Sequence, residues 1–336
     1  MTITVGIKAL NEERHVAASI TSALEAVAPF GGDVVLADSG STDRTVEIAR
    51  QFPIRIVQFS NTAERSCGAG AQLAFQHVRG EFFYLLDGDM VLDPGFVAAG
   101  LDYLAQHPRV AGVGGHVCEV NTVAHEFQIR QDHKRDRHWQ PGTVDRLDCG
   151  GLYRTAAVRD VGYFADRNLH AFEEFELGAR LQSRGWTLAR IDHRAVDHYG
   201  HVAGGYALLW RRLRSGYAGA SGEVLRGALG QRHLPIVLRR LHHVRHAAVV
   251  VAWWALMIAA LAVPGWRIAA WPLLAAPLLF LSLRRRSLRL GLFSFASWNV
   301  GTWGFLHGLL RRRVPPAAAI ASIDLSPAAR PLSASA

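Results

Sequence analysis

Hydrophobic and polar positions divide the sequence into two parts. In residues 1–230, short apolar runs alternate with stretches whose apolar residues recur at helical spacing. Apolar runs at 2–10, 33–37 and 82–86 predict buried strands, and residues 11–26 predict a helix after the first strand. Because strands alternate with helices, this part is expected to be an α/β domain on a mostly parallel central sheet with flanking helices.

Residues 231–314 contain three long apolar blocks. The blocks are residues 247–266, 268–283 and 290–310. A helix needs about 20 apolar residues to cross the hydrocarbon of a bilayer. The first block has that length, and the second reaches it when Arg284 extends its charged end to the interface. Pro264 and Gly265 predict a turn between the two blocks, so we expect a transmembrane helical hairpin.

Arginines cluster at the ends of these apolar blocks. They are Arg239, Arg240 and Arg245 before the first, Arg284, Arg285 and Arg286 after the second, and Arg311, Arg312 and Arg313 after the third. By the positive-inside rule, both ends of the hairpin are expected in the cytoplasm. The third block carries Asn299 and His307, so a third span and an interfacial helix both stay open. Buried helices of a soluble protein are a further alternative.

The composition limits the classes of protein. A 50% apolar and 19% charged content excludes a disordered chain, and three cysteines exclude a disulfide scaffold. The net charge is +9 and the pI is about 10.1. Since the arginines cluster at apolar ends and no basic patch interleaves with aromatics, this charge predicts membrane orientation rather than nucleic-acid binding.

These patterns predict three regions. Residues 1–230 are expected to form the α/β domain, residues 231–314 a membrane anchor with two or three apolar helices, and residues 315–336 a flexible tail rich in Ala, Pro and Ser. The sequence opens on a strand pattern without a signal-peptide pattern. We therefore expect a multi-pass protein of the cell inner (cytoplasmic) membrane, with its α/β domain in the cytoplasm.

Acidic residues follow two of the predicted strands. Asp38 opens a turn rich in Ser, Gly and Asp, and Asp87-Gly88-Asp89 follows the strand at 82–86. Ligands of open α/β sheets bind at the carboxyl ends of strands, so Asp38 is a candidate contact for a base or ribose. Asp87 and Asp89 offer oxygen ligands that suit Mg²⁺ or Mn²⁺. The chain lacks GxGxxG and GxxxxGKS, which disfavours a dinucleotide dehydrogenase and a P-loop NTPase.

A third acidic motif, Glu173-Glu174, precedes a predicted helix that ends at Gly185. Carboxylates are stabilised near a helix N-terminus, so a purely structural role is one explanation of this pair. Arg180 lies four residues after Glu176, which is the spacing of a surface salt bridge.

The order of these motifs resembles that of a family 2 glycosyltransferase, over about residues 2–200. The motifs that carry the resemblance are Ala9-Leu10-Asn11-Glu12, Asp38 with its turn, Asp87-Gly88-Asp89, and Glu173-Glu174 with Arg180. The resemblance implies a GT-A fold, a nucleotide-diphosphate sugar donor, a divalent metal and inversion at the anomeric carbon. The apolar C-terminal part is similar to that of membrane-bound members.

The resemblance also implies roles for single residues. Donor nucleotide contacts fall on Ala9, Leu10, Asn11, Glu12, Asp38 and Asp87; metal contacts on Asp89, Asp87 and His198; the catalytic base on Glu174 or Glu173; and the acceptor side on Gly150, Gly151 and Arg180. Glu174 stands where the family has aspartate, so the base stays open between the two glutamates. Lys8 stands where the family often has proline, a departure that is expected to change little.

The expected function is that of a hexosyltransferase in cell-surface polysaccharide or glycolipid synthesis. It uses Mg²⁺ or Mn²⁺ and transfers the sugar to a hydroxyl of a lipid-linked or polysaccharide acceptor at a membrane, with no nucleic-acid partner. A metal-dependent nucleotidyl or phosphoryl transferase and a non-catalytic membrane-associated binding protein are the alternatives. Spacing does not determine the donor base, the sugar or the acceptor.

Overall fold

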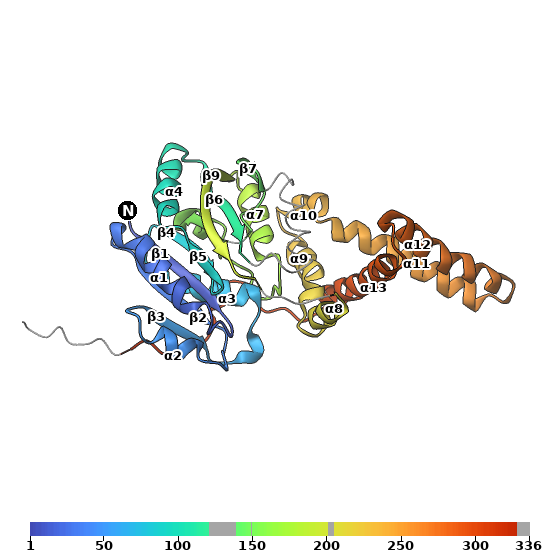
Figure 1. The fold of residues 1–336 in the computed structure, drawn as a ribbon. Coiled ribbons are helices and arrows are strands. Elements are labelled where there is room, and N and C mark those ends of the chain that lie inside the picture. Colours follow the sequence, from blue (N-terminus) through green and yellow to red (C-terminus); the bar gives the residue numbers. More distant parts are fainter. Residues whose placement is uncertain (121–138, 149, 201–204, 328–336) are drawn as a thin grey trace, which may run out of the picture. The chain divides into compact units, whose positions relative to one another are not determined.

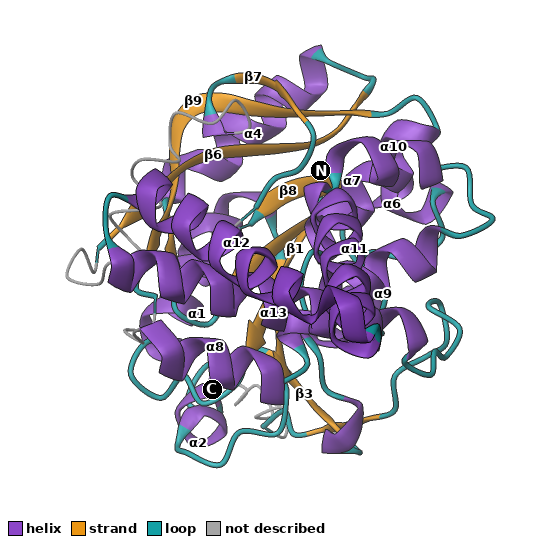
Figure 2. Cartoon of the chain, turned by 90° about the vertical axis from the view of Figure 1, so that its right-hand side faces the viewer, coloured by secondary structure: helices purple, strands orange, loops and turns teal. Residues whose placement is uncertain are grey.

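The computed structural model describes residues 1–120, 139–148, 150–200 and 205–327 (Figure 1). The chain forms two compact units. The first comprises Met1–Leu169, Glu173–Val202 and Val314–Ala336, and the second comprises His170–Phe172 and Ala203–Arg313. We call them the sheet unit and the helical unit. In its described part, the helical unit consists of helices, turns and loops (Figure 2).

The sheet unit is built on one ten-stranded sheet in the order β10-β3-β2-β1-β4-β8-β6-β9-β5, with β7 paired to β9. The strands are β1 (Ile3–Ala9), β2 (Asp33–Asp38), β3 (Arg55–Phe59), β4 (Phe82–Asp87), β5 (Met90–Leu92), β6 (Val110–Glu119), β7 (Gly142–Val144), β8 (Gly151–Arg154), β9 (Thr187–His198) and β10 (Ser322–Asp324). β1 pairs in parallel with both β2 and β4, and β2 with β3. β8 runs antiparallel to β4 and β6, so the complete sheet is mixed.

Helices cover both faces of this sheet. They are α1 (Val16–Val27), α2 (Thr45–Ala49), α3 (Cys67–Gln76), α4 (Pro94–Gln106), α6 (Thr155–Asp160) and α7 (Glu173–Ser183). In β4, Tyr84 and Leu86 pack into the core under α1 and α4, whereas Phe83 and Leu85 pack into the core with α3 and α7. Successive strand residues point to opposite faces, which explains why the central strands are continuous apolar runs.

The predicted strands are confirmed in this part of the chain, but the first helix begins later than expected. α1 starts at Val16 rather than at residue 11. Asn11 has a positive φ of 59° and its side-chain oxygen accepts a hydrogen bond from the Thr42 backbone N–H at 2.8 Å. Such a side-chain bond to the backbone competes with helix formation, so residues 11–15 form a turn.

The C-terminal segment differs from the flexible tail that the composition suggested. Ser322–Asp324 form β10, which pairs antiparallel with β3, and Ile320 is buried. Gln76 holds the same segment by donating to the Ile320 carbonyl and accepting from the Ile320 N–H. Composition alone missed this strand because three paired residues and one buried isoleucine leave little signal in a segment rich in Ala and Pro.

The helical unit contains α8 (Gly205–Arg214), α9 (Ala220–Ala228), α10 (Leu234–Arg240), α11 (His242–Ala262), α12 (Ala270–Arg285) and α13 (Leu288–Leu310). Residues 205–230 therefore cluster with the apolar helices and not with the domain expected at 1–230. Among the residues that the structure describes, two stretches are long and apolar enough to cross a membrane, His242–Ala262 and Pro264–Arg285, with mean hydropathies of 1.8 and 1.5. They match the predicted hairpin, with the turn at Pro264.

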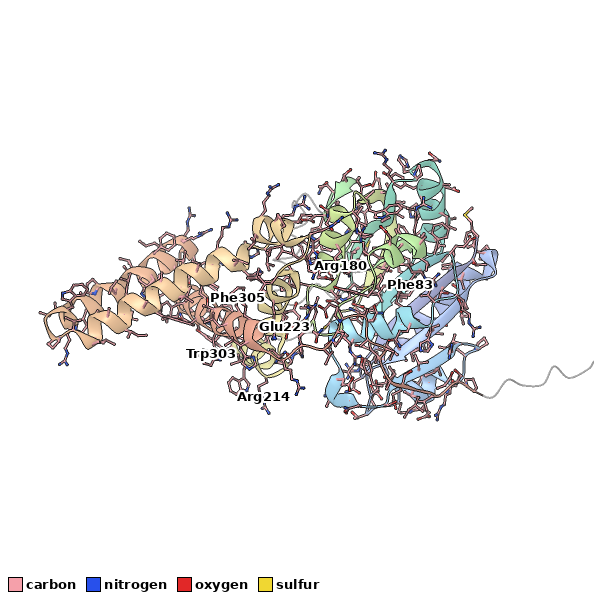
Figure 3. The ribbon with its side chains drawn as sticks, turned by 180° about the vertical axis from the view of Figure 1, so that it is seen from behind. Phe83, Arg180, Arg214, Glu223, Trp303 and Phe305 are labelled. Atoms are coloured by element: carbon pink, nitrogen blue, oxygen red, sulfur yellow. The ribbon has the colours of Figure 1, made fainter. Side chains whose placement is uncertain are left out.

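A close crossing of α9 and α13 organises the helical unit. A Cβ atom on Gly222 would lie 1.9 Å from the Phe305 carbonyl oxygen, so only glycine permits this approach. The neighbouring Glu223 is buried and accepts from the His170 backbone N–H at 3.0 Å and from Arg311 at 2.5 Å. Figure 3 labels Glu223 and Phe305 among these helices, together with the exposed Trp303.

Candidate functional site

The carboxyl ends of β1, β2 and β4 bring the first predicted motifs together. Sheet register places Ala9 beside Asp38 and Lys8 beside Asp87. Asn11 continues from β1 and contacts the turn after β2, where its backbone N–H donates to Ser41 Oγ at 2.9 Å. The donor-site residues predicted from β1, β2 and β4 therefore share one edge of the sheet, as parallel strands require.

Asp38 is buried and shapes the turn that follows it. Its Oδ2 atom accepts from the backbone N–H groups of Gly40 and Ser41, both at 2.9 Å, and from Gln58 Nε2 at 2.8 Å. Ser41 Oγ donates to the other oxygen. Since a carboxylate has about four acceptor positions, these bonds use most of its capacity. Contact between Asp38 and a nucleotide stays a prediction, beside this structural role.

Negative charge is concentrated where β4 ends. Burial, followed by repulsion from Asp89 and Asp87, raises the pKa of Glu12 to about 8. Burial also raises the pKa of Asp87, against the opposing effect of Lys8. The carboxylates outnumber the cations beside them, since Lys8 and His198 are each shared with a further carboxylate, and a divalent cation would supply the remaining positive charge. The residues therefore fit Mg²⁺ or Mn²⁺.

The donor set suits a metal that is shared with a substrate. Among the described residues, no group of three His, Cys, Asp or Glu side chains is arranged to hold a metal ion. Magnesium is commonly held by one or two carboxylates, with substrate phosphates and water completing its shell. Asp87 and Asp89 would hold the ion in that way.

His198 is bound to acidic partners rather than presented as a free ligand. Its Nε2 lies 3.4 Å from Asp89 Oδ2 and its Nδ1 lies 2.8 Å from Glu119 Oε2. Burial lowers its pKa, but hydrogen bonds to Asp89 and Glu119 outweigh burial and raise the pKa to about 9. In this protonated state His198 orients Asp89, and the expected contact of His198 with a metal stays a prediction.

Lys8, which stands where the family often has proline, was expected to change little, but its side chain contacts two carboxylates of the candidate site. Its Nζ lies 2.9 Å from Glu173 Oε1 and 3.2 Å from Asp87 Oδ1. Burial lowers the pKa of Lys8, but the two carboxylates outweigh it and raise the pKa well above the ordinary value. The lysine thus joins the end of β4 to the start of α7. A lone lysine inside an apolar strand was the sequence signal for this role.

Glu173 and Glu174 lie in the first turn of α7 in different environments. Burial opposes ionisation of Glu173, but Lys8 holds its pKa below the ordinary range. Burial and then repulsion from Asp148 raise the pKa of Glu174 to about 8. Glu173 is therefore an ionised partner of Lys8, while Glu174 has the pKa of a group that exchanges a proton near neutral pH.

Replacing Lys8 by methionine is expected to raise the pKa of Glu174 further, because the lysine charge lowers that pKa. If Glu174 must be ionised for activity, the rising limb of a pH–rate profile moves to higher pH, and activity at pH 7 falls by about tenfold. Steady-state rates between pH 6 and 10 measure the limb. Lys8→Arg, which keeps the charge, should preserve its position. A limb that stays in place or moves to lower pH in Lys8→Met would contradict this coupling.

Arg180, predicted on the acceptor side, is instead committed to packing. Its Nε and Nη2 atoms donate to the two Glu176 oxygens at 2.8 and 2.9 Å. The remaining N–H groups donate to three backbone carbonyls, those of Val161, Tyr163 and Phe164. These bonds use all five guanidinium donors, so the buried Arg180 (Figure 3) ties α7 to residues 161–164. The short surface salt bridge that spacing suggested is a buried pair.

Replacing Arg180 by methionine is expected to destabilise the protein by about 3–5 kcal/mol, because Glu176 would remain buried without its ion-pair partner. Urea unfolding of the detergent-solubilised chain measures this loss. Arg44→Met is the matched control, since the Arg44–Glu47 pair is exposed and should leave the midpoint unchanged. Equal midpoints for both variants would refute the structural assignment of Arg180.

Gly150 and Gly151 bring β8 close to β4. Gly150 has a φ of +95°, and a Cβ atom there would lie 2.9 Å from the Leu85 carbonyl oxygen. Gly151 pairs with Leu85 and is buried. These glycines have a packing reason that is independent of any acceptor, so their acceptor role stays a prediction. The adjoining residue 149 lies outside the described residues.

The mixed sheet with helices on both faces is the fold of a class, the GT-A glycosyltransferases. Residues 4–162, just under half of the chain, match the family model described as Glycosyl transferase family 2. The acidic pair and His198 lie beyond the matched residues.

Similar proteins agree with this class. "Putative glycosyltransferase EpsE" from Bacillus subtilis (strain 168) is 26% identical over 185 residues, which are 52% of this chain and 65% of EpsE. The mannosyltransferase PcManGT from Pyrobaculum calidifontis, solved with GDP-Man and Mn²⁺, has a similar fold: TM-score 0.59 and 17% identity, covering 90% of this chain and 86% of that one. TarS 1-349 from S. aureus, in complex with UDP-GlcNAc, has a TM-score of 0.51 and 14% identity, with 91% of each chain covered.

Proposed function

We propose that the protein is a metal-dependent glycosyltransferase that moves a sugar from a nucleotide-diphosphate donor to an acceptor hydroxyl, with inversion. The observation that carries the proposal is the pairing of two functions at one sheet edge. Asp87, Asp89 and Glu12 form a group in which carboxylates outnumber the neighbouring cations Lys8 and His198, and Glu174 is a buried carboxylate with a pKa of about 8. The similar PcManGT and TarS structures contain nucleotide sugars, which supports this donor class.

The proposed chemistry assigns one proton transfer to this chain. Glu174 accepts the proton of the acceptor hydroxyl while that oxygen bonds to the anomeric carbon and the bond to the diphosphate breaks. One displacement with one base inverts the anomeric configuration. A divalent cation held by Asp87 and Asp89, when bound, stabilises the charge of the leaving diphosphate. Lys8 keeps Glu173 ionised and in place, and His198 orients Asp89.

The proposed site of action is a membrane. Between residues 203 and 313 the sequence has sixteen arginines and one acidic residue, and the candidate spans expose apolar side chains such as Leu256, Ile258 and Leu279. This charge favours a cytoplasmic position for the ends of the hairpin, on the side where nucleotide sugars are made. A lipid-linked or polysaccharide acceptor at the inner membrane fits that position.

Donors labelled separately in the sugar and in the nucleotide test the reaction. Incubation of the detergent-solubilised chain with membrane extract should give a product that carries the sugar label alone. Transfer of the nucleotide label would instead identify a nucleotidyl transferase. Resistance of the protein to carbonate extraction from membranes tests the proposed location.

A further inference from the structure

The helical unit contains a cavity of about 250 Å³ between α11 and α13. His242, His243 and His246 of α11 line one side, and Ser297, Trp298 and Thr302 of α13 line the other. One water molecule needs only about 10–15 Å³ of cavity volume, so this cavity has room for a larger polar group.

Two ring nitrogens in the lining have unused hydrogen-bonding capacity. His243 Nδ1 and His246 Nε2 are buried and have no hydrogen-bond partner among the residues that the structure describes. The rings are held in place by neighbours, since the His246 ring meets the Trp298 ring at 4.1 Å and the His242 ring meets the His243 ring at 4.1 Å. Buried polar atoms normally have a partner, and a bound group in the cavity would supply one.

The charge around the cavity selects an anion. None of the residues that line it is acidic. Glu223, the one acidic residue between positions 203 and 313, is already paired with His170 and Arg311. The exposed Arg239, Arg240 and Arg245 lie within a few residues of the histidines. No side chain caps the start of α11, whose N-terminal dipole also favours negative charge.

We propose that this cavity binds the phosphate group of an anionic membrane lipid. Imidazole N–H groups and the hydroxyls of Ser297 and Thr302 are donors for phosphate oxygens. The described residues provide no three-ligand metal arrangement, which favours the anion over a cation. The lipid origin rests on the proposed membrane association, because the histidines occupy the first turns of a candidate span, at headgroup depth. It does not depend on glycosyl transfer.

Native mass spectrometry of the full detergent-solubilised chain tests the site with a matched pair of probes. Phosphatidic acid and diacylglycerol with the same acyl chains differ only in the phosphate. We expect the chain to bind one phosphatidic acid at least about tenfold more tightly than diacylglycerol. His243→Phe combined with His246→Leu should remove that preference. Thr302→Val, a nearly isosteric change on the opposite wall of the cavity, should also reduce the preference for phosphatidic acid. This variant tests the site if the double histidine variant folds poorly.

Two controls separate the site from general attraction to a basic protein. Arg267→Gln removes one positive charge in the turn after α11, far along the sequence from the histidines, and should leave phosphatidic acid binding within about twofold. Inorganic phosphate is the second probe. Displacement of phosphatidic acid by equimolar inorganic phosphate would overturn the lipid assignment and indicate a soluble phosphate ligand. Any of three results would overturn the phosphate site. They are equal binding of both lipids, undiminished binding of phosphatidic acid by the histidine and Thr302 variants, and Zn²⁺ binding that requires the same histidines.

Discussion

The substitution Glu174→Gln is expected to lower kcat by about 10²–10⁴-fold, the usual contribution of a general base. The amide keeps the size of the Glu174 side chain but accepts no proton from the acceptor hydroxyl. Because the change removes a charge and not a contact surface, KM for the donor should stay close to the wild-type value. Initial rates at saturating donor and acceptor measure the effect.

The pH profile gives this prediction a second readout. A base with a pKa raised to about 8 is half ionised at that pH and mostly ionised above it, so the wild-type rate should rise with pH through about 8. The rising limb should be absent from the residual activity of Glu174→Gln. Glu173→Gln is the matched control and should retain the limb, since its carboxylate serves Lys8. Normal turnover by Glu174→Gln would move the base to Glu173 or to another residue.

Loss of the Asp89 carboxylate is expected to reduce activity by at least about 10²-fold, because a metal ion at the leaving diphosphate contributes several kcal/mol to transition-state stabilisation. The Asp89→Ala variant should bind Mn²⁺ more weakly, as calorimetry in the presence of nucleoside diphosphate would show. Chelation of divalent ions should reduce the wild-type rate to a similar level, and adding Mg²⁺ or Mn²⁺ should restore it.

Asp192→Asn is the control for this substitution, since Asp192 is an exposed partner of His116 on the sheet unit. It should keep full activity and the same metal requirement. Full activity of Asp89→Ala after chelation would exclude the metal role of this motif. His198→Gln provides an intermediate case, because losing an orienting partner typically weakens a metal site by about 10–100-fold.

The central sheet could be predicted from the sequence because its strands have a strong local signal. The apolar runs at 2–10, 33–37 and 82–86 correspond to β1, β2 and β4, and every end agrees to within about one residue. Each strand is buried on both faces, so each is a continuous apolar run. Two features were missed because they depend on contacts with distant residues that no local pattern contains. The turn at residues 11–15, where a helix was predicted, depends on Thr42, and the strand β10 depends on β3.

Sequence patterns selected residues for the candidate site, and the functions of these residues stay predictions. Asp87, Asp89 and Glu174 could be selected because short acidic motifs follow strands or open a helix. The partners of Lys8 and Arg180 could not, since Lys8 meets Glu173 across 165 positions and Arg180 reaches backbone carbonyls up to 19 positions away. An arginine that looks available in the sequence is fully used once its carbonyl partners are known.

If the helical unit crosses a bilayer, as the proposed membrane association implies, the pairing of β10 with β3 limits the number of crossings. The sheet receives strands from residues both before and after the helical unit, so the chain must leave and return on the same side of the membrane. Only an even number of crossings satisfies this parity. The candidate hairpin of His242–Ala262 and Pro264–Arg285 would supply two crossings, and α13 would then be an interfacial helix rather than a third span.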